Sequence, residues 1–216
     1  MRHAAAGSLR GCLLALVLAL PVSAAAEPEV ASRTLSAGER ARLEAGGMVA
    51  RSLRFHEGRG RYVGGVSYQV VDAKPEAVLA ALSDVTNWPN ALPRTKSARL
   101  VSSADGLSRV ELVQGTALVD ARYTVVLDRA PDGETIRFWL DPSLPHDIAD
   151  VWGYFRVKEL PGGRSLITVG AALDLGNGIT RLLFEDKIAG LMLRAPRQIR
   201  DFVEPRALAL ATSPGR

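Results

Sequence analysis

The sequence predicts an α+β fold in which one antiparallel sheet packs against a long C-terminal helix. Between residues 62 and 175, short β-branched and apolar stretches alternate with tight turns, which is typical of antiparallel strands. From residue 176 to 210, apolar residues recur every three or four positions, the period of a helix with one apolar stripe. The stripe consists of Phe184, Ile188, Leu191, Ala195, Ile199 and Phe202. A helix that follows a sheet buries such a stripe on that sheet.

The first 26 residues have the three parts of a secretory signal peptide. Arg2 and Arg10 form a basic region, residues 12–20 form an apolar run, and residues 21–26 supply candidate cleavage sites with small side chains. The apolar run is much shorter than the roughly 20 residues that a membrane span needs. We therefore expect an exported protein, periplasmic or secreted, with no transmembrane span after cleavage.

Charge and cysteine content narrow the classes of function. Removal of Arg2 and Arg10 lowers the formal charge from +4 to +2, too little to argue for binding of nucleic acid or anionic lipid. The one cysteine, Cys12, leaves with the signal peptide, so a disulfide framework and a thiol nucleophile are excluded from the mature chain. The length suits one domain with its own core.

Residues 27–60 are predicted to form an extension that packs on the main domain, with a long exposed linker as the alternative. Ser36 and Glu39 have the spacing of a capping box, in which each side chain bonds the backbone N–H of the other residue. A short helix should follow them, and residues 48–55 could form a strand.

The main domain is predicted to span residues 61–210, followed by a disordered tail at residues 211–216. After a first strand at residues 62–71, Pro75 suits the first turn of a small helix, and a second helical piece contains Trp88. Further strands are predicted at residues 96–102, 107–115, 118–129, 134–140, 151–160 and 164–175. Short connections make neighbouring strands antiparallel, in a sheet of about six to seven strands.

Alternation along the strands separates two faces of the sheet. The apolar face should point at the long helix. Trp139, Trp152 and Tyr154 fall on the outer face beside charged residues, where the N-terminal extension could cover them. Pro196 lies inside the predicted helix and should kink or break it near residues 193–195. Such a break could be a hinge or a static bend.

Several stretches carry a resemblance to a known family. They are residues 71–78 (Val-Asp-Ala-Lys-Pro-Glu-Ala-Val), residues 82–84 (Leu-Ser-Asp), residues 88–93 (Trp-Pro-Asn-Ala-Leu-Pro) and residues 153–157 (Gly-Tyr-Phe-Arg-Val). With the last strand running into a long helix, they resemble the START-like (SRPBCC) superfamily of lipid-transfer START domains, polyketide cyclases and coenzyme Q-binding proteins. Phe155 stands where many relatives have Trp. Residues 27–60 lie outside the family pattern.

The resemblance covers about residues 62–206 and implies a helix-grip fold, with a curved sheet wrapped around the C-terminal helix. It also implies a cavity between them for an apolar ligand. The candidate cavity residues are Trp88, Leu112, Gln114, Tyr123, Phe138, Phe155, Val169, Phe184, Ile188 and Met192. Gln114 is a ligand contact if its face points inward, or else a strand-end side chain that bonds the backbone or water.

The leading hypothesis is a monomeric carrier that binds a lipid or a polyaromatic molecule without catalysis. A cyclase or aromatase using the same cavity is the second, and a protein-interaction module using the outer aromatic rings is the third. A membrane surface or a protein also remains open as a partner. We expect no catalytic residues and no cofactor. We also expect no metal, because His146 with Asp147 and Asp150 offers one histidine where a metal site needs three or four convergent ligands.

Overall fold

The computed structural model describes residues 34–116, 119–176 and 179–212. The strands are β1 (Val49–Glu57), β2 (Gly60–Val71), β3 (Thr95–Ala104), β4 (Leu107–Gly115), β5 (Asp120–Arg129), β6 (Thr135–Leu140), β7 (Asp150–Leu160) and β8 (Arg164–Asp174). The helices are α1 (Ala37–Glu44), α2 (Pro75–Ser83), the 3-10 turn η1 (Val85–Asn87), α3 (Trp88–Ala91), α4 (Ile179–Met192) and α5 (Ala195–Thr212).

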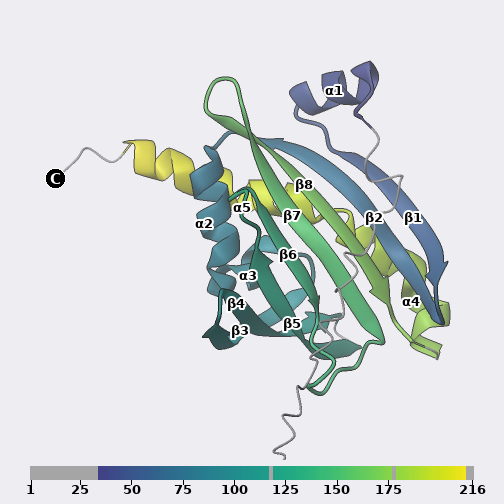
Figure 1. The fold of residues 1–216 in the computed structure, drawn as a ribbon. Coiled ribbons are helices and arrows are strands. Elements are labelled where there is room, and N and C mark those ends of the chain that lie inside the picture. Colours follow the sequence, from purple (N-terminus) through teal and green to yellow (C-terminus); the bar gives the residue numbers. More distant parts are fainter. Residues whose placement is uncertain (1–33, 117–118, 177–178, 213–216) are drawn as a thin grey trace, which may run out of the picture.

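All strands of the described residues belong to one antiparallel sheet in the order β1-β2-β8-β7-β6-β5-β4-β3. β3 to β8 follow one another as a meander. β2, from the N-terminal part of the chain, pairs with the edge of β8 that β7 leaves free. The curved sheet wraps around the C-terminal helices, and α2 and α3 lie beside α5, at the end of the molecule away from α4 (Figure 1). The predicted α+β helix-grip fold is confirmed.

The sheet has eight strands in the described residues, where about six to seven were predicted. The additional strand is β1, which pairs with β2 from Val49↔Tyr68 to Glu57↔Gly60. Gly58, at φ 57°, allows the tight turn between them. Residues 49–57 therefore form an edge strand of the main sheet, and their pairing satisfies backbone groups that β2 would otherwise leave unpaired.

The C-terminal helix is broken into two. α4 ends at Met192 and α5 begins at Ala195, so the break lies where Pro196 led us to expect one. A proline at this position lacks an N–H for the carbonyl of Met192 and would clash with it in a continuous helix. α5 continues to Thr212, so the first two residues of the predicted tail are helical. Residues 213–216 and the predicted signal peptide lie outside the described residues.

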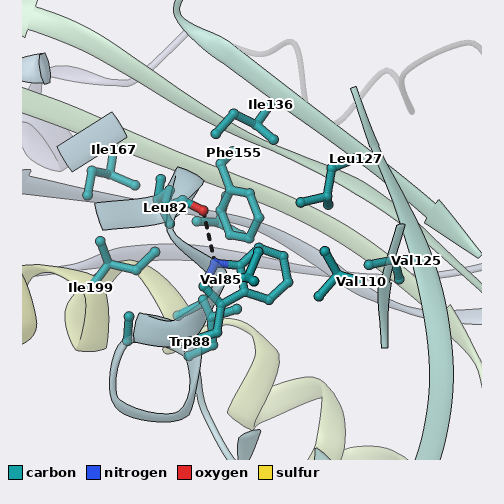
Figure 2. Packing of buried hydrophobic residues seen from close by; sticks show 14 of the residues in the cluster. Leu82, Val85, Trp88, Val110, Val125, Leu127, Ile136, Phe155, Ile167 and Ile199 are labelled. Atoms are coloured by element: carbon teal, nitrogen blue, oxygen red, sulfur yellow. Dashed lines mark hydrogen bonds between the residues drawn. The ribbon is translucent and has the colours of Figure 1, made fainter. Parts of the chain in front are cut away.

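The main core lies on the concave face of the sheet. Leu82, Val110, Ile167 and Ile199 are completely buried there, and Figure 2 shows them around Trp88 and Phe155. Each such side chain contributes roughly 1.5–3 kcal/mol of hydrophobic stabilisation. The inward-facing apolar residues of the strands and the apolar stripe of α5 therefore pack together in one core.

A second, smaller core lies on the outer face beneath α1. It is built from Leu43, Val49, Val66, Tyr68 and Val70. The capping box at the start of α1 is present, with Ser36 N donating to a Glu39 carboxylate oxygen at 2.8 Å and Glu39 N donating to Ser36 Oγ at 3.2 Å. Glu39 also pairs with Arg51 of β1 at 2.8 Å, so helix and strand hold each other in place.

The three outer-face aromatic residues do not form one exposed patch. Trp152 packs near Phe55 of β1, with ring centroids 6.2 Å apart, and Phe55 stacks on Tyr62 at 5.1 Å. Tyr154 is buried, and Trp139 keeps 37% of its surface exposed. The interaction-module alternative needs all three rings exposed, so this partial covering by β1 counts against it.

Candidate functional site

A cavity of about 440 Å³ lies between the concave face of the sheet and the C-terminal helices. This size falls within the roughly 300–1,000 Å³ of small-molecule sites. Nine of the ten predicted residues line it: Trp88, Leu112, Gln114, Tyr123, Phe138, Phe155, Val169, Ile188 and Met192. The side chain of the tenth, Phe184, lies outside the described part of the structure. Most of the lining is apolar, as a hydrophobic ligand would require.

Aromatic rings form one wall of the cavity. The centroids of Phe138 and Phe155 lie 5.3 Å apart, and those of Trp88 and Phe155 lie 6.3 Å apart. The indole N–H of Trp88 donates to the carbonyl of Leu82 at 2.9 Å, as Figure 2 shows. This bond orients the ring and leaves its apolar surface for the cavity. The indole donor of Trp88 is therefore paired outside the cavity.

Small residues keep this space from being filled. Ala121, Ala171 and Ala195 lie among the large lining side chains. Gly153 is required beside Phe138, because a Cβ there would lie 2.5 Å from the ring. Ile188 and Met192 approach from α4 and are only partly buried, so the helix roofs the cavity without plugging it.

The interior polar groups of the cavity bond to one another. Tyr123 donates its hydroxyl to Gln114 Oε1 at 2.5 Å, and Gln114 donates its amide N–H to Thr95 Oγ1 at 2.8 Å. Burial raises the pKa of Tyr123 well above its usual value, so the phenol stays protonated. Two roles were considered for Gln114, a ligand contact and a side chain that bonds the backbone or water. Its side chain lines the cavity, and its hydrogen-bond partners are the side chains of Thr95 and Tyr123.

Charged residues lie where the cavity meets solvent. Arg94, Asp120 and Lys187 line it and are exposed, and Asp120 pairs with Lys96 at 2.6 Å. Sequence reasoning missed all three lining residues. Arg94 belongs to no motif, alternation along its strand predicts an outward-facing Asp120, and Lys187 lies beside the apolar stripe of the helix and not within it.

The loop with His146 has structural contacts. His146 Nδ1 lies 2.7 Å from the carbonyl oxygen of Ile148, and Asp147 accepts from the backbone N–H of Arg122 at 2.8 Å. Asp150 accepts from the hydroxyl of Tyr62 at 2.7 Å, and desolvation and this bond raise the pKa of Tyr62. In the described residues, no group of three or more His, Cys, Asp or Glu side chains is arranged to hold a metal ion.

Comparison with known families identifies the chain. Residues 65–201 match the family described as polyketide cyclase / dehydrase and lipid transport. The chain belongs to this family. The match runs from β2 to α5 and so includes every element that lines the cavity. No curated protein matches the sequence.

Solved structures share the fold at low sequence identity. An aromatase/cyclase, Zhui, from a Streptomyces species is 15% identical with a TM-score of 0.55, covering 76% of this chain and 98% of that one. A STAR-related lipid transfer protein from Xanthomonas axonopodis is 15% identical with a TM-score of 0.54, covering 70% and 98%. A Thermus thermophilus protein is 18% identical with a TM-score of 0.57, covering 68% and 98%. At these identities the similarity establishes the fold.

Among the described residues, none of the helices has the length and apolar character to cross a membrane. The C-terminal helices instead direct their apolar residues at the sheet, as Ala195, Ile199 and Phe202 do in the core. The described residues of the stripe from Ala195 to Phe202 are thus buried within the domain.

Proposed function

We propose that this protein binds and carries a hydrophobic small molecule in the cavity without transforming it. The observation that carries this proposal is the apolar cavity of about 440 Å³ enclosed by the sheet, α3 and the C-terminal helices. Burial of an apolar ligand there would remove its surface from water at about 25 cal/mol per Å² of gross gain. The family supports a hydrophobic ligand in general terms, and whether it is a lipid or a polyaromatic molecule belongs to the proposal.

The chemistry of the lining favours a carrier over a cyclase. General acid–base catalysis works best with a group whose pKa lies near the working pH. Tyr123 is the deeply buried titratable group among the described lining residues, and its pKa is raised by burial. Its hydroxyl is already engaged with Gln114. The charged lining residues, Arg94, Asp120 and Lys187, lie at the solvent side.

The proposal includes export. The first 26 residues have the composition of a signal peptide, and a carrier in the periplasm or outside the cell would move apolar molecules through an aqueous compartment. Mass measurement of the intact protein from the periplasmic fraction tests this part. Loss of the first 26 residues or so is expected, and a full-length cytoplasmic chain would contradict it.

Native mass spectrometry of the protein purified without detergent tests the carrier function. We expect a bound apolar molecule that organic extraction releases unchanged. The variant Ala171→Leu should reduce occupancy at least about fivefold, because the added side chain points into the cavity. Ala50→Leu, at an exposed strand position outside the cavity, is the matched control.

Two outcomes would contradict this function. One is protein with no bound molecule that also fails to take up any apolar ligand. The other is equal occupancy in Ala171→Leu and the parent protein. Conversion of a bound polyketide to a cyclised product would favour the cyclase alternative.

A further inference from the structure

We propose that the cavity takes a neutral apolar molecule with a hydroxyl group, an alcohol or a phenol, and that this hydroxyl bonds to Tyr123 and Gln114. The inference rests on the proposed function, because it names the chemical class of the ligand in the same site. It comes from the hydrogen bonds that these two side chains make to each other and from the chemistry of the groups involved.

Three polar side chains form a short chain of hydrogen bonds across neighbouring strands. Tyr123 on β5 donates to Gln114 Oε1 at 2.5 Å, and Gln114 on β4 donates to Thr95 Oγ1 at 2.8 Å. Gln114 lies opposite Thr95 of β3 and Ala121 of β5 in the sheet. Tyr123 and Thr95 are each 6% exposed. The chain of bonds is therefore built into the sheet and largely shielded from solvent.

Two members of this chain have further hydrogen-bonding capacity. A phenol oxygen that donates its hydrogen can still accept a bond, and a side-chain amide has two N–H donors, of which Thr95 accepts one from Gln114. Tyr123 and Gln114 both line the cavity, so they offer a ligand one acceptor and one donor. A hydroxyl is complementary to this pair, because it both donates and accepts. Its bond to Tyr123 Oη would also extend the chain, whose members polarise one another.

The surroundings of Tyr123 favour a neutral group over an anion. Leu112 pairs with Tyr123 in the sheet, Val125 follows on the same strand face, and both side chains line the cavity. Burial raises the pKa of the Tyr123 hydroxyl, so this position already disfavours a negative charge. A buried charge without a partner is far more costly than a neutral polar group that makes a hydrogen bond. We therefore expect this position to accept a hydroxyl and to reject a carboxylate.

Three ligands with one ring system test the inference: 2-naphthol, 2-methylnaphthalene and 2-naphthoate. Fused aromatic rings suit the wall formed by Trp88, Phe138 and Phe155. 2-Methylnaphthalene has nearly the shape of 2-naphthol without the hydroxyl, and 2-naphthoate carries an anion instead. Affinities for the intact protein are measured by equilibrium dialysis at neutral pH. We expect 2-naphthoate to bind at least about tenfold more weakly than 2-naphthol.

Variants separate the hydroxyl from the rings. Tyr123→Phe should weaken binding of 2-naphthol about three- to tenfold and leave 2-methylnaphthalene unchanged, because only the phenol oxygen is removed. Thr95→Val should act in the same direction with a smaller effect, because Thr95 orients the amide of Gln114. Tyr62→Phe is the matched control, since the hydroxyl of Tyr62 donates to Asp150 outside the cavity. It should leave all three affinities unchanged, and circular dichroism confirms that each variant is folded.

The inference is overturned if Tyr123→Phe weakens 2-naphthol and 2-methylnaphthalene equally, or weakens neither. Tighter binding of 2-naphthoate than of 2-naphthol to the parent protein would overturn it as well. If Tyr123→Phe does not fold, Thr95→Val and the comparison with 2-naphthoate decide. In all these cases, loss of 2-methylnaphthalene binding in Ala171→Leu would leave the carrier function standing. If none of the three ligands binds, this inference fails, and a bound apolar molecule in native mass spectrometry would still support the carrier function.

Discussion

Replacement of Trp88 by Phe tests how the aromatic wall of the cavity is held. The side chain of Trp88 is 2% exposed, and its indole N–H bonds the carbonyl of Leu82 at 2.9 Å. Leu82 lies in the last turn of α2, where carbonyl groups have no partner within their own helix. The indole therefore caps α2 from the following helix, α3.

The loss of stability follows from these contacts. Phe cannot donate the hydrogen bond, and a buried carbonyl without a partner costs about 1–3 kcal/mol. The smaller ring adds a packing loss, and complete removal of such a side chain costs about 3–5 kcal/mol. We expect Trp88→Phe to lower the free energy of unfolding by about 2–3 kcal/mol.

Urea unfolding followed by far-UV circular dichroism measures this change without depending on tryptophan fluorescence. With a slope of about 2 kcal/mol per molar urea, the midpoint should fall by at least about 1 M. Trp139→Phe is the matched control, because Trp139 is 37% exposed on the outer face. It should change stability by less than about 0.5 kcal/mol. Equal midpoints for the two variants would refute the reasoning.

Two further changes test the N-terminal elements. Bonds from Arg51 and the backbone N–H of Ser36 lower the pKa of Glu39 from 4.5 to about 2, so its contribution is present above pH 4.5 and is lost as pH falls toward 2. Glu39→Gln should therefore lose less stability than the parent protein over that range, as urea midpoints measured at several pH values would show. Parallel pH curves would contradict the assigned role. Gly65→Ala should destabilise by more than about 2 kcal/mol, because its Cβ would lie 2.0 Å from the Arg51 carbonyl oxygen at a φ of 143°. Gly190→Ala, which meets nothing within 4 Å, should be neutral or slightly stabilising in a thermal melt, and equal melting shifts would count against the steric argument.

Alternation and helical period were enough to predict which residues face one another. Phe155 and Val169 were placed on the inner face because their strands alternate, and both line the cavity. Ile199 was placed on the helix stripe by its spacing, and it is completely buried against the sheet. The capping box could be predicted from the sequence because its two residues are three positions apart. These features depend on local geometry, so they could be predicted from the sequence.

Features that depend on contacts between residues far apart in the sequence could not be predicted from it. The sequence predicts an N-terminal extension in which residues 48–55 could form a strand, whereas β1 pairs with β2 along its full length in the main sheet. The partial cover of Trp152 by Phe55 follows from that pairing. Arg94 gave no signal either, because its place at the rim depends on the bond between its carbonyl and Gly115.

Strand alternation and helical period by themselves predicted an antiparallel sheet packed on a C-terminal helix, with most of the inward-facing residues, because side-chain direction follows from strand and helix geometry. The helix-grip fold was implied by the resemblance to the START-like superfamily. The tertiary structure decided that these residues enclose a cavity of about 440 Å³. Small residues such as Ala171 among large ones such as Phe138 can produce either solid packing or a void. The outcome depends on how far the helices stand from the sheet, and the sheet's curvature and the break before Ala195 set that distance.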